Sequence, residues 1–180
     1  MTVHTLKSRI IKYRLYDDEF HGWLYYTLDL DRYELSISGE TTASYKWVET
    51  PESESFIKLM VRCDKWYLLN KLFREVFDIE ASTKSIKAYI KENYDYEDSD
   101  TLKSVLEDID NMECGGQECF VNSIESILNS HCLSYDSYYI WECCERRYKH
   151  WDERAIVLFC EYIKPELKKE LGSEGEAYGL

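Results

Sequence analysis

The first 50 residues alternate between apolar and polar positions with the two-residue period of β-strands. In the first run, Ile11, Tyr13 and Leu15 occupy every second position between polar neighbours. Four such runs follow one another: residues 10–16, 20–30, 34–38 and 44–48. They are rich in β-branched and aromatic residues, which favour strands. Short turns separate the runs, so the pattern predicts a four-stranded antiparallel meander with helices on one face.

After residue 50 the apolar residues recur at the three- and four-residue spacing of helices. The helix starts predicted from cap residues and spacing lie at Ser53 or Ser55, Asp64, Ser82 or Thr83, Asp100 or Thr101, and Cys119. Residues 138–148 and 151–163 are predicted as further helices. Pro165 is expected to end or kink the last of these, because it lacks the N–H that a helix needs.

These patterns predict the α+β class, with an N-terminal antiparallel sheet followed by a mostly helical region. The expected boundaries are 1–50 for the sheet, 51–172 for the helices and 173–180 for a frayed tail. A chain of 180 residues suits one domain, so we expect residues 1–180 to form a single α+β domain.

Composition supports a folded, reduced, cytoplasmic protein. Aromatic residues make up 15% of the chain, including 16 Tyr, whereas disordered chains are poor in aromatics. The first residues carry charges where a signal peptide needs an apolar run, and no stretch approaches the roughly 20 apolar residues that span a bilayer. We therefore expect a cytoplasmic location with no membrane partner, in which the seven Cys stay reduced.

Charge adds the strongest functional signal. The net charge is −13, which repels nucleic acids and anionic membranes and attracts basic surfaces. Residues 92–118 hold ten acids and a single base, Lys103. One interpretation is a surface that imitates nucleic-acid phosphates, with tyrosines as flat contacts. The residues predicted to bind a partner in this way are Tyr94, Asp95, Tyr96, Glu97, Asp98, Asp100, Glu107, Asp108, Asp110 and Glu113. A solvated loop followed by the outer face of an ordinary helix fits the pattern as well.

The sequence contains few other residue patterns that indicate catalysis or metal binding. The chain has no G-x-S-x-G, P-loop or HExxH motif, and none of its four His has a catalytic signature around it. The candidate metal ligands are Cys114, Cys119, His131, Cys132, Cys143, Cys144 and His150. Their spacing is poor for tetrahedral zinc, because adjacent helical cysteines point about 100° apart. We therefore expect no enzyme activity, no cofactor and no metal.

Direct DNA binding is the alternative that the basic residues suggest. Lys7, Arg9, Lys12 and Arg14 can line one edge of the predicted sheet. A second basic group comprises Arg146, Arg147, Lys149 and Arg154. Both groups are expected to form ion pairs within the protein or to shield exposed sheet edges, because the chain as a whole is acidic.

A resemblance to known proteins rests on three segments: 44–47 (Ser-Tyr-Lys-Trp), 50–60 (Thr-Pro-Glu-Ser-Glu-Ser-Phe-Ile-Lys-Leu-Met) and 67–72 (Tyr-Leu-Leu-Asn-Lys-Leu). Over roughly the first 80 residues the chain resembles small acidic proteins carried by phages and mobile elements of Gram-positive bacteria. Its acidic, Tyr-rich character is similar to that of type II-A anti-CRISPR proteins, which inhibit Cas9. The resemblance implies a bacterial host cell and no catalytic residues.

Three functional hypotheses follow, of which the third is a metal-dependent domain that uses the Cys and His residues named above. The first is a non-catalytic inhibitor that binds a basic nucleic-acid groove of a host-defence nuclease, with an anti-CRISPR that blocks Cas9 as the specific case. The second is a phage accessory protein that contacts DNA through its basic N-terminal strand.

Overall fold

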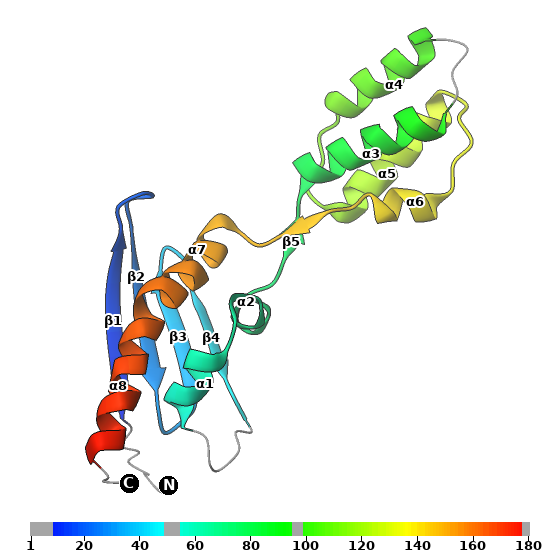
Figure 1. Ribbon diagram of the computed structural model, residues 1–180. Coiled ribbons are helices and arrows are strands. Elements are labelled where there is room, and N and C mark those ends of the chain that lie inside the picture. Colours follow the sequence, from blue (N-terminus) through cyan, green and yellow to red (C-terminus); the bar gives the residue numbers. More distant parts are fainter. Residues whose placement is uncertain (1–8, 49–54, 95–98, 178–180) are drawn as a thin grey trace, which may run out of the picture. The chain divides into compact units, whose positions relative to one another are not determined.

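The computed structural model describes residues 9–48, 55–94 and 99–177, and its contacts divide the chain into two compact units (Figure 1). Unit 1 comprises residues 1–74 and 148–180, and unit 2 comprises residues 75–147. Each unit has its own hydrophobic core. The single domain expected for residues 1–180 stays a prediction, which the number of unfolding transitions can test.

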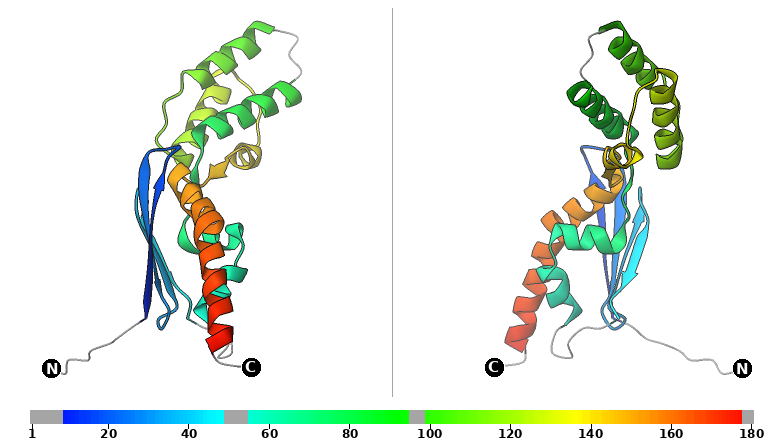
Figure 2. Two further views of the ribbon diagram at one scale, coloured as in Figure 1. Left: turned by 60° about the vertical axis from the view of Figure 1, so that its left-hand side comes forward. Right: turned by 90° about the vertical axis from the view of Figure 1, so that its right-hand side faces the viewer.

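Unit 1 is built on the predicted four-stranded antiparallel sheet. Its strands are β1 (Ile10–Asp17), β2 (Gly22–Asp29), β3 (Glu34–Gly39) and β4 (Ala43–Lys46), and they pair in sequence order. The helices of unit 1 lie on one side of the sheet in both views of Figure 2. The predicted α+β fold class and meander are therefore confirmed.

The covered face of the sheet forms the first core. Leu24, Tyr26 and Leu28 of β2 are fully buried, as is Leu35 of β3. Tyr26 also donates a hydrogen bond of 2.7 Å from its hydroxyl to the carbonyl oxygen of Ala155 on the covering helix. Such a bond satisfies the polar end of a ring that is otherwise packed in the apolar core.

Among the described residues, the helical segments that cover this face are α1 (Phe56–Arg62), α2 (Lys65–Leu72), α7 (His150–Leu158), the π-helical segment η1 (Phe159–Ile163) and α8 (Lys164–Ala177). Ser55 and Asp64 cap α1 and α2 as predicted, each accepting a backbone N–H with its side-chain oxygen. Pro165 was predicted to end or kink the last helix, but the helix does not end there: α8 continues to Ala177. Pro165 occupies the first turn of α8, where a missing N–H is tolerated, and a π-helical turn precedes it.

Unit 2 consists of helices and one short strand pair. Its elements are β5 (Val76–Phe77), α3 (Ile79–Asn93), α4 (Ser99–Asp110), α5 (Gln117–Ser130), α6 (Ser137–Glu142) and β6 (Arg146–Arg147). Strands β5 and β6 pair with each other and were not predicted. The second core contains Ile86, Val105, Phe120 and Ile124, contributed by α3, α4 and α5.

Several sequence predictions in unit 2 were wrong. Helix α4 already includes Ser99 and Asp100, so it does not start at Asp100 or Thr101. Helix α3 begins after Asp78, whose carboxylate accepts the N–H of Ala81, and not at Ser82 or Thr83. Ser82 lies buried inside the helix, where its hydroxyl donates to the carbonyl of Asp78 and accepts the backbone N–H of Glu145. The helix predicted over 138–148 is the six-residue α6, because the chain then enters β6 to pair with β5.

Gly39 fixes the register between β2 and β3, and its substitution tests the fold. Its φ of +122° is one that side chains disfavour, and a Cβ there would meet the carbonyl oxygen of Trp23 at 2.1 Å. We expect Gly39→Ala to lower the free energy of unfolding by about 1–3 kcal/mol, measured by urea titration. Gly172→Ala is the matched control. Gly172 is exposed in helix α8 and a Cβ there would meet nothing within 4 Å, so the substitution should raise stability by up to about 1 kcal/mol. Equal losses in both variants would contradict this assignment.

Candidate functional site

The two units differ sharply in charge. Unit 2 contains 17 acids and six bases, a net charge of −11, whereas unit 1 contains 18 acids and 16 bases, a net charge of −2. Nearly all of the excess negative charge of the chain therefore belongs to residues 75–147. A unit of this composition attracts cationic surfaces and repels nucleic acids.

The predicted acids fall on and beside helix α4. Asp100, Glu107, Asp108, Asp110 and Glu113 are all exposed, whereas Val105 and Ile109 on the other side of α4 are buried. The sequence spacing therefore placed these five acids correctly at the surface. Asp95, Tyr96, Glu97 and Asp98 lie outside the described residues.

Several of these acids have partners within unit 2. Lys87 of α3 contacts both carboxylate oxygens of Asp110 at 2.6 Å. The Nε2 atom of His131, after α5, lies 2.8 Å from Asp108. Lys103 lies 4.0 Å from Glu107. Asp110 thus points toward α3 and Asp108 toward the end of α5, so the acids are spread across the exposed side of α4. Exposed pairs of this kind contribute about 0–1 kcal/mol each, so a cationic partner can replace them at low cost.

In the part of unit 2 that the structure describes, the exposed aromatic residues lie on α6. Tyr94 is half-buried against the second core, and its hydroxyl donates to the carbonyl of Ser134 at 2.7 Å. Tyr138, Tyr139 and Trp141 of α6 are 61%, 45% and 45% exposed. Tyr138 donates a hydrogen bond to Glu142. A partner-binding role for Tyr94 stays a prediction. The α6 residues were missed because the sequence predicted only a longer helix over 138–148 and did not indicate which of its side chains are exposed.

The candidate metal ligands do not converge. All seven cysteines are free thiols, and no group of three or more His, Cys, Asp or Glu that fits a metal ion occurs within residues 9–48, 55–94 and 99–177. Burial raises the pKa of the Cys143 and Cys160 thiols, which keeps them protonated and unreactive at neutral pH. In the same part of the chain, no helix is long and apolar enough to cross a membrane.

The basic residues separate into paired and unpaired groups. Arg147 contacts Asp78 at 3.1 Å, and Arg154 contacts Asp17 and Glu19, so the expected internal ion pairs are confirmed for these two arginines. Arg9 at the start of the sheet pairs with Asp31. Lys7 lies outside the described residues. Lys12 and Arg14 of β1 are exposed, and no carboxylate of the described chain forms an ion pair with either of them.

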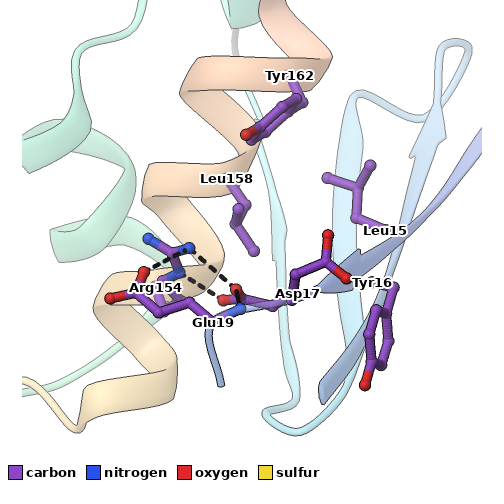
Figure 3. Close-up of a pocket in the computed structure, with 8 residues that line it drawn as sticks. Leu15, Tyr16, Asp17, Glu19, Arg154, Leu158 and Tyr162 are labelled. Atoms are coloured by element: carbon purple, nitrogen blue, oxygen red, sulfur yellow. Dashed lines mark hydrogen bonds and ion pairs between the residues drawn. The ribbon is translucent and has the colours of Figure 1, made fainter. Parts of the chain in front are cut away.

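A pocket of about 220 Å³ lies in unit 1 beside β1, and the ion pair of Asp17 and Arg154 lies at its wall (Figure 3). The side chain of Asp17 is 2% exposed, and Arg154 donates to its two oxygens at 2.5 and 3.0 Å. Arg154 also contacts Glu19 at 3.2 Å. Hydrogen bonding to Arg154 holds the pKa of the Asp17 carboxyl below its usual range, against the opposing effect of burial. The arginine is therefore occupied by acids of its own unit, and the pair joins β1 to α7.

A family comparison bears on the origin of the protein. Residues 1–165 match the model of the family Phage_phiTE_072, described as a phage family. The chain belongs to this family. The phage origin implied by the sequence resemblance is therefore confirmed, and a phage accessory protein is the functional class that the family supports. Neither the curated proteins nor the solved structures contain a match to the chain. The likeness of this phage-family protein to Cas9 inhibitors stays a prediction.

The Asp17–Arg154 pair generates a test of stability against pH. The folded-state pKa of Asp17 lies below its unfolded value of about 3.9, so its contribution is present at neutral pH and is lost as the pH falls through the folded-state pKa. We expect Asp17→Asn to lower the free energy of unfolding by roughly 1.5–3 kcal/mol at pH 7, and to reduce the loss of stability on acidification below about pH 4. Urea titrations at pH 7, 4 and 3 measure both effects.

Asp18→Asn is the control, because Asp18 is the exposed neighbour of Asp17. It should change the unfolding free energy by no more than about 0.5 kcal/mol. If the two variants had equal stability at pH 7, the ion pair would not hold β1 to α7.

Proposed function

We propose that this phage-family protein acts by binding and not by catalysis, and that unit 2 occupies a basic nucleic-acid groove on a partner protein. The partner class is a host-defence nuclease, and type II-A Cas9 is the specific target. The protein would act in the cytoplasm of the bacterial host cell. The observation that carries this proposal is the net charge of −11 concentrated in residues 75–147.

The charge density of α4 suits a groove that holds a single strand. Its 12 residues extend about 18 Å at 1.5 Å per residue. One DNA strand places a phosphate about every 3.4 Å, or roughly five over that length. Helix α4 presents four exposed acids, Asp100, Glu107, Asp108 and Asp110, and Glu113 follows directly after it. The number of negative charges per unit length of α4 thus approaches that of one DNA strand and is below that of a duplex.

The aromatic side chains of α6 supply a second kind of contact to a basic groove. Arginine side chains stack on the faces of Trp and Tyr with an attraction of about 0.5–2 kcal/mol. Trp141 and Tyr138 are exposed, and Glu142, which accepts a hydrogen bond from Tyr138, adds a carboxylate that can accept from the same guanidinium. Tyr and Trp are also the residues that most often anchor protein interfaces.

A charge-reversal variant tests this proposal. We expect the wild-type protein to inhibit DNA cleavage by guide-loaded Cas9 at near-equimolar ratios. Reversing Asp100, Glu107, Asp108 and Glu113 to Lys should weaken inhibition at least 100-fold, because the cationic groove would then meet like charge. Asp110 is retained, since its pair with Lys87 joins α4 to α3. A cleavage assay over a range of inhibitor concentrations gives the half-inhibitory ratio.

The matched control reverses four exposed acids of unit 1: Asp18, Glu40, Glu161 and Glu166. Both variants have the same net charge of −5, so only the position of the charge differs. The control should inhibit as the wild type does, and circular dichroism should show both variants folded. Full inhibition by the unit 2 variant would overturn the proposed surface. Absence of inhibition by the wild type would overturn Cas9 as the target.

A further inference from the structure

The outer face of the sheet in unit 1 carries an ordered row of rings and a guanidinium. Tyr16 and Trp23 are paired across β1 and β2, and so are Arg14 and Tyr25. The Arg14 guanidinium lies 3.7 Å from the centre of the Trp23 ring and 5.5 Å from that of Tyr25. The rings of Tyr16 and Trp23 are 4.7 Å apart. The three rings are each about 40% exposed, although aromatic side chains of this size are usually well buried.

From this row we infer that the outer face of the β1–β4 sheet binds single-stranded nucleic acid, with bases stacked on Trp23 and Tyr25. Arg14 now fills the space beside Trp23 that a flat base would take. When a base enters, the guanidinium can move to a phosphate, since no carboxylate of the described chain holds it. Stacking on exposed aromatic side chains is the usual way in which open sheets bind unpaired bases.

The charges on this face are complementary to a phosphate backbone, in contrast to those of unit 2. Lys12, Arg14 and Lys46 are exposed on it. Of its acids, Asp29 pairs with Arg32 and is 13% exposed, and Glu34 accepts hydrogen bonds from the hydroxyls of Ser36 and Ser44. The three cations are therefore the charges available to a ligand, whereas both acids are engaged within the sheet.

The remaining side chains favour a polar strand over a protein partner. Thr27, Ser36, Ser38 and Ser44 extend from the aromatic row toward β4, so the face offers hydroxyl groups where an apolar protein interface would need hydrocarbon. A duplex fits poorly, because its bases are stacked inside and cannot reach the rings. An unpaired strand exposes both bases and phosphates to the same flat surface.

The two kinds of contact make separate quantitative predictions. Stacking contributes about 1–3 kcal/mol per base, so removal of one ring should weaken binding by about 5- to 150-fold. Each phosphate contact to a single strand contributes about −0.7 to the slope of log affinity against log salt. With three available cations the slope should be about −2, shallow for a nucleic-acid-binding protein.

The decisive experiment measures fluorescence anisotropy of a labelled 20-nucleotide oligo(dT) with the full-length protein. We expect saturable binding, at least about fivefold weakening by Trp23→Ala, and substantial recovery in Trp23→Phe, which restores a ring. Trp66→Ala is the matched control. Trp66 is 60% exposed in the same unit and also has a cation, Lys65, over its ring at 5.3 Å, but it lies on α2 and not on the sheet. It should bind as the wild type does.

Three results would overturn the inference: no binding of oligo(dT) at low salt, equal affinity for the same sequence in a duplex, or equal affinities of the Trp23→Ala and Trp66→Ala variants. A salt slope much steeper than −2 with no effect of Trp23 would indicate nonspecific charge binding instead. The unit 2 charge-reversal variant should keep the dependence on Trp23. Failure of this inference is therefore distinguishable from failure of the proposed function.

Discussion

Burial of alternate residues on one face of the β1–β4 sheet is the constraint on which the structure of unit 1 depends. Leu24, Tyr26 and Leu28 are fully buried against the helices, so Trp23 and Tyr25 must point the other way. A shift of one residue in register would exchange the two sets and expose the core. Gly39, which approaches the carbonyl of Trp23 more closely than any side chain allows, holds the register at the position where the aromatic row begins.

Electrostatic repulsion imposes a second constraint, which applies mainly to unit 2. A net charge of −11 opposes a compact state, and the second core must offset it. The pair of Asp110 with Lys87 relieves repulsion where α4 meets α3, and Asp108 lies within hydrogen-bond distance of His131 after α5. Stability alone would be served by fewer acids. The proposed cationic partner would relieve the repulsion that remains.

The sequence predicted those features that depend on local periodicity and local caps. The alternation of apolar and polar residues predicted the four strands. Ser55 and Asp64 predicted two helix starts, because each cap depends only on a side-chain oxygen and a backbone N–H three residues further along the chain. It also placed the α4 acids at the surface. It missed the β5–β6 pair, because Val76 and Arg147 are 71 residues apart and two-residue strands show no period. It took Ser82 for a cap, although its hydroxyl is used by the distant N–H of Glu145.

The aromatic row shows why such a surface is hard to recognise from the sequence. Arg14 and Trp23 belong to different strands, and only the antiparallel register brings the guanidinium over the ring. The sequence alone does not distinguish Trp23 from Trp66. In the structure, Trp23 lies beside Arg14 and Tyr16 on the sheet, whereas Trp66 lies on α2 beside Lys65. The two proposed surfaces then have a common logic. Under the first proposal, unit 2 would take the place of a strand in a basic groove. Under the second, the sheet of unit 1 would hold the strand that is displaced.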